Sequence, residues 1–327
     1  MMVGRREARE NGCFCSCANR RSLRFSLLIF LVLLPLTGTS LSAWAADTSA
    51  PRLLKVYQEL RDVSQRTPFG IPLRMQSEER NDQVIAEVQA IFEHPFDTVK
   101  AALSSPASWC EIVPLNVVMK ACTYQVQAQE TLLTFYIGRK FYQRPQEAAV
   151  QPYQFVALTE DPATLSIQMS ALMGLYGTRA HRFQLQAASV EGRTVIAMHT
   201  SYVQGAAARL ATAIYLATLG RDKVGFSREE TSAGGPPAYV KGFRGMIERN
   251  IMRYYLAIEA FLDTQAVPIA HRFEARINMA YELMERYPLQ LHDLAKSEYL
   301  DAKHREHEDQ LRLQQDLNRA TPPRSNP

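Results

Sequence analysis

The sequence has no surplus charge outside its first 45 residues, and this scarcity excludes one large class of function. The chain of 327 residues carries 37 basic and 33 acidic side chains, and six of the basic and two of the acidic ones lie in residues 1–45. The remainder therefore holds 31 of each sign and has no net charge. Because a nucleic-acid-binding surface needs excess positive charge to displace counterions, we expect no nucleic-acid partner.

Motifs of the common enzyme classes are also missing. The sequence contains no glycine-rich phosphate loop ending in Lys-Ser/Thr, no Gly-x-Ser-x-Gly nucleophile turn and no His-Glu-x-x-His metal motif. It contains no internal repeat either. We therefore expect no cofactor, and an enzymatic activity stays open only through isolated polar residues.

The apolar run nearest the N-terminus is too short for an ordinary membrane-spanning helix. Three arginines within residues 20–24 precede about ten apolar residues between 26 and 36, and Ala43-Trp44-Ala45 follows. A positive segment, an apolar core well under roughly 20 residues and small residues at the cleavage positions are typical of a secretory signal peptide. The sequence predicts export to a periplasm, with a mature chain beginning near Ala46. Extracellular release and a retained N-terminal membrane anchor are the alternatives.

Cysteine is scarce, with five residues in all, and three of them belong to the predicted leader. Cys110 and Cys122 remain in the exported chain. Since two cysteines in an oxidising compartment are usually bridged, the sequence predicts a Cys110–Cys122 disulfide that contributes on the order of 2–3 kcal/mol. Two buried thiols are the alternative. A metal site is not favoured, because neither cysteine has a Cys or His at the close spacing of zinc sites.

Turn signals and alternating apolar residues indicate a long antiparallel meander in the middle of the chain. Residues 50–63 repeat apolar side chains at three- and four-residue steps and predict a helix, which ends before Pro68. Residues 83–92 alternate like a strand, and a helix follows from Pro95. Six further strand-like runs cover 117–127, 131–143, 153–160, 164–172, 177–188 and 193–204. Sequential strands with short connections indicate an antiparallel sheet rather than a βαβ series.

Two helices are expected after these strands. Residues 206–219 carry Arg209 as their single charge and precede Gly220, so they predict a helix that is buried or covers an apolar surface. Residues 242–263 give the clearest helical pattern, because apolar residues recur every three or four positions along one stripe. The stripe consists of Phe243, Ile247, Ile251, Tyr254, Ile258 and Leu262.

The last segment predicts a helical tail divided by Pro288. Its run Lys303–Asp309 mixes both charge signs, which indicates a solvated helix face. His304 and His307 lie one turn apart with Glu308 beside them, but in a solvated helix this spacing does not favour a metal site. The predicted divisions are a leader (1–45), an N-terminal helix and linker (46–79), a main domain (80–265) and a helical extension (266–327).

The order of these elements resembles a known superfamily. A strand and helix over Ile85–Leu103, a long meander and the closing helix Phe243–Leu262 resemble the START-like, or SRPBCC, helix-grip proteins. These include lipid-transfer proteins, polyketide cyclases and ligand-binding plant proteins. Segments Tyr215–Phe226 and Arg249–Glu259 resemble secreted bacterial members without a known activity. The resemblance covers residues 80–265 and implies an α+β fold, in which a curved antiparallel sheet wraps around the C-terminal helix and leaves a ligand cavity; helix 206–219 and the tail are additions.

The resemblance also implies where a ligand binds. The stripe of the closing helix would face the cavity, joined by Arg179 and Tyr202, although a stripe of this kind can also be plain core. His181 and His199 are the candidate catalytic residues, since imidazole beside tyrosine can act as acid and base; alternatively, both face solvent from the outer side of the sheet. Candidate lining residues with adaptable side chains are Met169, Met173, Met198 and Met246. Cations that can bind a phosphate or carboxylate are Arg139, Arg179, Arg221, Lys223, Arg244 and Arg249.

Three functions fit these expectations. The first is an exported binding or carrier protein for a lipid-like hydrophobic molecule, with residues 206–219 as a lid or transient membrane contact. The second is a cyclase- or hydrolase-type enzyme that uses His181, His199 and tyrosines in the same cavity. The third is an interaction module with a filled core, whose helical tail binds a partner protein. The scarcity of enzyme motifs favours a binding protein over an enzyme.

Overall fold

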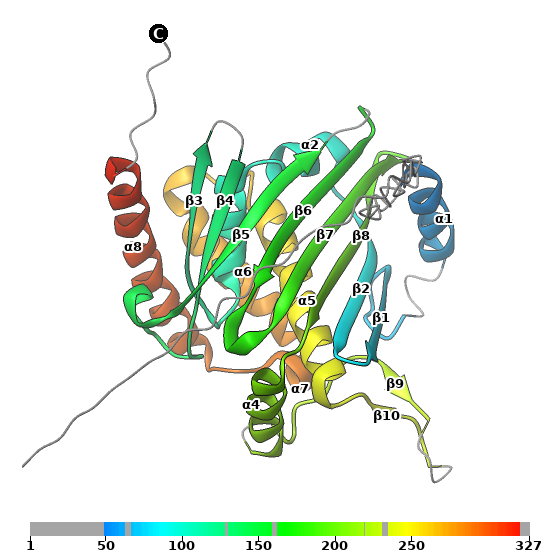
Figure 1. Ribbon diagram of the computed structural model, residues 1–327. Helices are drawn as coiled ribbons and strands as arrows, with labels where there is room; N and C mark the ends of the chain where they lie inside the picture. The colour runs from blue at the N-terminus through cyan, green and yellow to red at the C-terminus, as the bar shows by residue number, and fades with distance from the viewer. Residues whose placement is uncertain are drawn as a thin grey trace, which may run out of the picture. The chain divides into compact units, whose positions relative to one another are not determined.

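The alternating apolar residues of the middle region form one eight-stranded antiparallel sheet (Figure 1). The computed structural model describes residues 49–62, 67–127, 130–158, 162–218, 220–230 and 235–320, which belong to one compact unit that begins at Ala46. The predicted leader lies outside the described residues. The strands are β1 (Leu73–Arg80), β2 (Gln83–Phe92), β3 (Met119–Gln127), β4 (Glu130–Ile137), β5 (Ala149–Leu158), β6 (Thr164–Met173), β7 (Arg179–Val190) and β8 (Arg193–Val203).

The strand order across the sheet is β1-β2-β8-β7-β6-β5-β4-β3. Strands β3 to β8 therefore form a meander, and the last of them returns to pair with β2. Strand β1 pairs along its whole length with β2, from Leu73 opposite Ala90 to Arg80 opposite Gln83. This hairpin lies partly in the stretch 46–79, for which the sequence predicted a helix and a linker. The sequence did not reveal the hairpin, because the short turn after Arg80 contains no glycine or proline.

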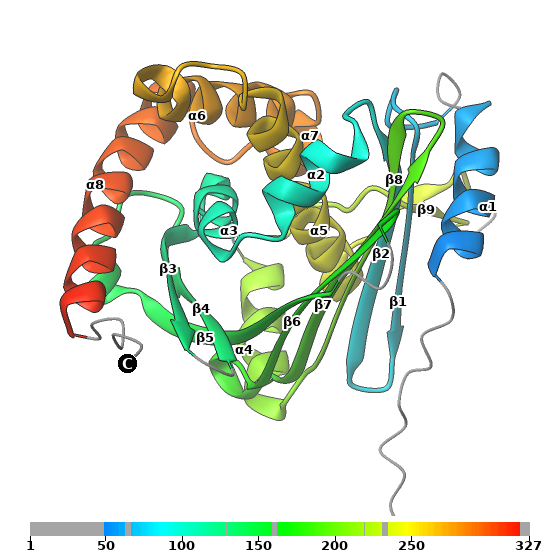
Figure 2. The ribbon, with the colours of Figure 1, turned by 90° about the horizontal axis from the view of Figure 1, so that it is seen from above.

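Helices cover both faces of the curved sheet (Figure 2). The helices are α1 (Ser49–Arg61), α2 (Phe96–Leu103), α3 (Pro106–Ile112), α4 (Ala206–Ala217), α5 (Gly242–Asp263), α6 (Ile269–Glu285), α7 (Pro288–Leu291) and α8 (Lys296–Ala320). Helix α1 lies on the outer face, where its Leu53 and Tyr57 pack with Val195 and Ala197 of β8. Helices α2, α3 and α5 lie on the concave face, and α6 packs on α5.

Helix α5 is the central element of the core. Its stripe residues Ile247, Ile251 and Ile258 are at most 1% exposed, and the helix packs against β1 and β2. The buried Glu248 fixes the loop before it, because its carboxylate accepts hydrogen bonds from the backbone N–H groups of Phe226 and Ser227 at 2.6 and 2.9 Å. The three-to-four-residue spacing in the sequence is thus the direct cause of this burial.

Near the end of α5, Glu259 gives the stability of the fold a testable pH dependence. Burial raises the pKa of Glu259 to about 7, although the hydrogen bond from Tyr255 Oη, at 2.7 Å, opposes the shift. The folded state therefore binds more protons than the unfolded state between the unfolded pKa, near 4.5, and about 7. We expect this contribution to be fully present below the unfolded pKa and to be lost as pH rises through 7, by on the order of 2–3 kcal/mol.

The difference in unfolding free energy between the wild type and Glu259→Gln, measured by urea denaturation across this pH range, isolates the effect. Histidines with lowered pKa, such as His181 and His199, push stability in the opposite direction but are common to both proteins. A difference that stays constant with pH would contradict the assignment to Glu259.

The predicted disulfide is confirmed. Cys110 at the end of α3 is bonded to Cys122 of β3, and both residues are buried. Ser105 caps the start of α3, where its side chain accepts from the N–H of Ser108, and Trp109 Nε1 donates to Leu103 O at the end of α2 at 2.7 Å. The disulfide and this hydrogen bond fix α3 against the concave face.

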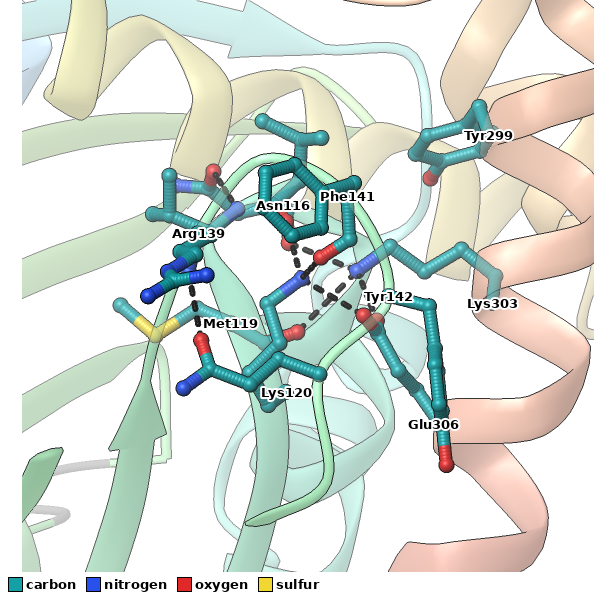
Figure 3. Close-up of polar contacts among 12 residues, drawn as sticks. Asn116, Met119, Lys120, Arg139, Phe141, Tyr142, Tyr299, Lys303 and Glu306 are labelled. Carbon is teal, nitrogen blue, oxygen red and sulfur yellow. Dashed lines mark hydrogen bonds and ion pairs between the residues drawn. The ribbon is translucent and has the colours of Figure 1, made fainter. Parts of the chain in front are cut away.

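The charged run of the tail has the expected solvated face, with His304, Arg305 and Glu308 exposed, but two of its charged residues are buried on the other side of the helix. Lys303 is 3% and Glu306 1% exposed, and Lys120 of β3 is fully buried beside them. The Glu306 carboxylate accepts from Lys120 Nζ at 2.6 Å and from Lys303 Nζ at 2.7 Å (Figure 3). Each ammonium also donates to two backbone carbonyls within residues 116–141. Because buried charges persist only when they are paired and hydrogen-bonded, this network determines where α8 docks.

Helix α8 also closes the edge strand β3 with side-chain amides. Cys122 N–H donates to Gln310 Oε1 at 2.7 Å, and Tyr124 N–H donates to Gln314 Oε1 at 2.9 Å. Together with the preceding ion pair, these contacts join every second strand residue to every fourth helix residue. Two strand residues span about 6.6 Å and four helix residues about 6.0 Å, so the two series stay in register. The glutamines thus occupy hydrogen-bonding positions of a neighbouring strand at an otherwise open edge.

Helix α4 is exposed, although the sequence predicted a buried or covering helix. Within its described residues only Ala208 is buried, while Leu210 and Ile214 are 64% and 58% exposed. Arg209 is close to Asp82, which holds the start of the helix at the β1–β2 turn. No helix within the described ranges is long and apolar enough to cross a membrane. Helix α4 therefore presents an apolar surface without a covering element among the described residues.

Candidate ligand site

A small, mostly apolar cavity lies between the concave face of the sheet and helices α3 and α5. Its volume is about 60 Å³, on a measure by which one water molecule needs roughly 10–15 Å³. The lining residues come from α3, the adjoining turn η2 (Val113–Leu115), strands β4 to β8 and α5. They are Trp109, Val113, Phe135, Tyr153, Met169, His181, Arg182, Phe183, Thr200 and Tyr254. The cavity has room for about four waters.

Three lining residues form a row across neighbouring strands. The register pairs Met169 with Phe183 and Phe183 with Thr200. Because directly paired residues point to the same face of a sheet, the row points together into the concave side. Trp109 meets Phe183 edge-on, with ring centroids 5.6 Å apart. Strand pairing thus builds one wall of the cavity, and α3 closes it.

His181 is the titratable histidine of the cavity wall. Its Nε2 lies 2.8 Å from Thr178 Oγ1, its Nδ1 lies 3.4 Å from Tyr153 Oη, and its ring stacks on Tyr202 with centroids 5.3 Å apart. Burial lowers the pKa of His181, so the imidazole is neutral near pH 7. A neutral imidazole can exchange hydrogen bonds with a ligand without placing a charge in an apolar cavity.

Hydroxyl groups add further polarity to the wall, which Arg182 also lines. Burial raises the pKa of both Tyr153 and Tyr254 far above the ordinary value, so both phenols stay protonated. The hydroxyls of Thr200 and Tyr254 have no hydrogen-bond partner within the described part of the chain. Donors of this kind in an apolar cavity are suited to the polar group of a small ligand.

The structure brings some of the predicted site residues together. Tyr254 lines the cavity, as does His181, and Tyr202 lies directly behind His181. Of the four methionines that were predicted to line the cavity, Met169 is among the lining residues and the other three are not. Four members of the predicted stripe instead lie within the hydrophobic core and Phe243 packs against it; the four are Ile247, Ile251, Ile258 and Leu262. Most of the stripe is therefore core, which was the alternative open from the sequence.

Arg179 and His199 lie away from the cavity. Ala180 has a φ of 52° and forms a bulge, after which the pairing of β7 with β8 shifts by one residue. Arg179 pairs with Val203 of β8 across this bulge and with Met173 of β6, and it is not among the residues that line the cavity. His199 pairs with Glu87 on the outer face, which α1 covers.

The two tail histidines have neighbours of another kind. His304 lies 2.9 Å from Glu274, and the ring of His307 stacks on Phe273 with centroids 3.9 Å apart. Across the described ranges, no group of three or more His, Cys, Asp or Glu side chains is placed to hold a metal ion.

Several lining residues were not among the predicted site residues, yet the sequence contained a signal for two of them. The Glu191-Gly192 turn joins β7 and β8, with Val190 opposite Arg193. Counting outward from that pair in equal steps places Phe183 opposite Thr200 on the concave face. Trp109 and Val113 had no comparable signal, because their placement depends on how α3 packs across the sheet.

The turn between β6 and β7 connects the cavity with helix α4. This turn, η4 (Leu175–Gly177), contains Tyr176 with a φ of 56°, a left-handed conformation that costs a non-glycine residue roughly 1 kcal/mol. Gly205, just before α4, lies so close that a Cβ there would be 2.5 Å from the Gly177 carbonyl oxygen. Thr178, the hydrogen-bond partner of His181, follows the same turn. A movement of η4 or α4 would therefore displace His181 in the cavity wall.

Comparison with known proteins gives distant structural likenesses only. No family model matches the chain, and no curated protein matches it. A STAR-related lipid transfer protein from Xanthomonas axonopodis is similar over 58% of this chain and 98% of its own, at 6% identity and a TM-score of 0.34. The lipid transfer and protein localization domain of human StarD13 covers 41% of this chain and 71% of its own, at 9% identity and 0.31. Norcoclaurine synthase from Thalictrum flavum covers 42% and 80%, at 14% identity and 0.30.

The assignment of the fold depends on the strand pairing rather than on these likenesses. Two short helices follow β2, six strands then form a meander whose last member pairs back with β2, and α5 crosses the concave face. This is the element order that the resemblance implied, with β1 and the α6–α8 tail as additions. The chain therefore has the α+β helix-grip fold of START-like, or SRPBCC, proteins.

Proposed function

We propose that the chain is a binding or carrier protein for a small hydrophobic molecule that bears a polar group. The single observation that carries this proposal is the apolar cavity with unpartnered hydroxyls at Thr200 and Tyr254. Hydroxyls without a partner in the described part of the chain are available to an external partner. A lipid-like molecule with a hydroxyl or carboxyl group has the matching chemistry.

A lipid-like ligand needs more room than about 60 Å³, since even benzene occupies engineered cavities of about 150 Å³. We therefore propose that the ligand enters by displacement of η4 and α4. The left-handed Tyr176 and the exposed position of α4 support opening at this end, because both reduce what holds the closed arrangement.

Helix α4 is also the proposed site of transient membrane contact. Leu210 and Ile214 expose their apolar side chains, and Tyr176 of the contacting turn is 73% exposed. Apolar side chains grouped on a surface commonly mark interaction sites. Co-sedimentation with phosphatidylcholine vesicles tests the contact, and binding unchanged by Leu210→Glu would contradict it.

The alternatives receive less support. The raised pKa values of Tyr153 and Tyr254 make both phenols poor proton donors, which favours binding over acid–base catalysis. The helical tail has already buried the apolar residues Ile277 and Leu283 of α6, so its main apolar face is not open to a partner protein. Export remains part of the proposal, because residues 20–45 have the sequence pattern of a secretory signal peptide; N-terminal sequencing of the mature protein tests it.

Filling the cavity is expected to abolish ligand binding. Val113, which is 1% exposed, lines the cavity, and Val113→Phe directs a ring into the space a ligand would use. We expect the affinity for a dansyl-labelled fatty acid to fall at least about tenfold, which corresponds to about 1.4 kcal/mol. Fluorescence titration of the purified protein measures it.

The matched control is Val156→Phe, which makes the same substitution on the outer side of β5, where Val156 is 38% exposed. Both variants are compared by thermal unfolding before titration, so that a folding defect is separated from a binding defect. Equal affinities of folded Val113→Phe and the control would refute the cavity as the ligand site. Recovery of the bound fatty acid in a chemically changed form would favour the enzyme alternative.

A further inference from the structure

Three cationic side chains from separate segments contact Asp293, outside the cavity, and a fourth lies close to them. Lys140 follows β4, Lys223 follows α4, and Arg249 and Arg253 lie one turn apart on α5. Lys140 Nζ and Arg253 Nη2 each lie 2.6 Å from an Asp293 oxygen, and Lys223 Nζ lies 3.4 Å from one. These four side chains are referred to below as the cationic cluster.

The cationic cluster carries more positive charge than its surroundings neutralise. Among the described residues, Asp293 is the one carboxylate within ion-pair distance of any member. Glu248 is next to Arg249 in the sequence, but its carboxylate already accepts hydrogen bonds from the Ser77 hydroxyl and from backbone N–H groups of 226–227. Even with both carboxylates counted against the four cations, two positive charges remain in excess.

The two arginines also have few hydrogen-bond acceptors. Arg249 is 4% and Arg253 7% exposed. Within the described ranges, Arg249 makes its hydrogen bond from Nη1 to Val224 O at 3.1 Å, and Arg253 donates from Nη2 to Asp293 while its buried Nε has no partner. A guanidinium has five N–H donors, and leaving buried ones unpaired is unfavourable. The site therefore has donors in place for an acceptor that the protein does not supply.

The pKa values within the cationic cluster reflect the same excess of positive charge. Burial lowers the pKa of Lys223, and the charges of Lys140 and Arg253 lower it further, although Asp293 opposes the shift. Burial likewise lowers the pKa of Arg249, and Arg253 adds to this effect. An additional anion at this place would relieve the repulsion among all four groups.

We propose that the cationic cluster binds a phosphate or carboxylate group, which Lys223, Arg249 and Arg253 contact while Asp293 acts as an internal anion at the same place. Guanidinium groups suit this role because their N–H donors match the spacing of phosphate and carboxylate oxygens. Asp293 can neutralise one cation only, so a second anion reduces the remaining excess of positive charge.

The proposed site is open to solvent on its lysine side. The side chains of Lys223 and Lys140 are 22% and 38% exposed. Lys223 also donates to the His292 carbonyl, which keeps its ammonium directed toward the loop that carries Asp293. None of these side chains lines the ligand cavity, so the proposal is independent of the function proposed above.

Thermal unfolding in increasing inorganic phosphate, with sodium chloride holding the ionic strength constant, tests the site. We expect a saturable rise of Tm in the wild-type protein. Lys223→Gln should weaken the apparent phosphate affinity about tenfold, because it removes one charge-assisted contact. The matched control is Arg221→Gln, whose side chain is 76% exposed and lies near Asp222, and it should keep the wild-type response.

Asp293→Asn provides a second variant with almost unchanged shape. Without phosphate it should have a lower Tm than the wild type, because the cationic cluster has lost its internal anion. Phosphate should then raise its Tm by more than it raises the wild-type value, since the added anion replaces the missing charge. Equal shifts in wild type, Lys223→Gln and Arg221→Gln would indicate a general salt effect and overturn the proposal, as would an Asp293→Asn shift no larger than that of the wild type.

The bound group can come from a lipid headgroup or from a soluble compound. Co-sedimentation with phosphatidylglycerol vesicles that is lost in Lys223→Gln and kept in Arg221→Gln assigns it to a headgroup. A saturable phosphate response without vesicle binding assigns it to a soluble phosphate or carboxylate. The absence of both responses overturns the proposal and leaves the fatty-acid titration of the cavity unaffected.

Discussion

Replacing Glu306 with glutamine is expected to lower the free energy of unfolding by about 3–5 kcal/mol, because it leaves two buried ammonium groups without their shared carboxylate. Lys120 and Lys303 are 0% and 3% exposed, so water cannot take the place of the lost charge. Burial lowers the pKa of both lysines even in the presence of Glu306. Guanidinium chloride unfolding of the wild type and the variant at neutral pH measures the loss.

Glu308→Gln is the matched control on the same helix. The Glu308 side chain is 70% exposed, and a surface substitution there should change the unfolding free energy by no more than about 0.5 kcal/mol. The Glu306→Gln variant has a second signature. Its lysines have folded-state pKa values below the unfolded ones, so the unfolded state binds more protons and stability should rise with pH above neutrality. A loss equal to that of the control would mean that the buried network contributes little.

The packing of α8 against β3 could not be predicted from the sequence. The run Lys303–Asp309 has the composition of a solvated helix, and nothing within it indicates a partner. The partner, Lys120, lies far away in the sequence, on a strand whose own pattern gives no reason for a buried lysine. Burial of Lys303 and Glu306 depends on the contact between two elements that lie far apart in the sequence.

Local periodicity, in contrast, was sufficient where one element determines its own burial. The stripe on α5 predicted a helix with one buried face, and Ile247, Ile251 and Ile258 are indeed in the core. The pattern could not tell whether that face meets a cavity or packed side chains, because both environments select the same residues. Helix α4 shows the converse: apolar composition predicts the helix itself, but Leu210 and Ile214 remain exposed.

The candidate site was predictable to the extent that strand register is predictable. His181 and Tyr254 were identified, and the turn at 191–192 fixes the register that brings Phe183 opposite Thr200. The bulge at Ala180 limited this approach, since one extra residue shifts the pairing of β7 with β8 beside Arg179. A left-handed alanine has no sequence signal comparable to that of a glycine, so this register shift becomes visible only in the structure.

Replacing both Cys110 and Cys122 with alanine is expected to lower the free energy of unfolding by about 3 kcal/mol. The two residues are 12 positions apart, and cross-linking a loop of this length removes that much conformational entropy from the unfolded chain. Chemical denaturation of the oxidised wild type and the double variant measures the change. Equal stabilities would mean that the native structure gains nothing from the bridge.

The same bridge has a second expected effect, on the α8 contact with the sheet edge. Gln310 donates to Cys110 O at 2.8 Å and accepts from Cys122 N–H at 2.7 Å, so one side chain binds both residues that the disulfide joins. Without the bridge these two backbone groups can move apart, and we expect the Cys122 amide to exchange faster with solvent deuterium. The control is Gln310→Ala in the oxidised protein, which removes the side chain and keeps the bridge. Faster exchange in this control with unchanged exchange in the cysteine variant would show that α8 holds the edge without the disulfide.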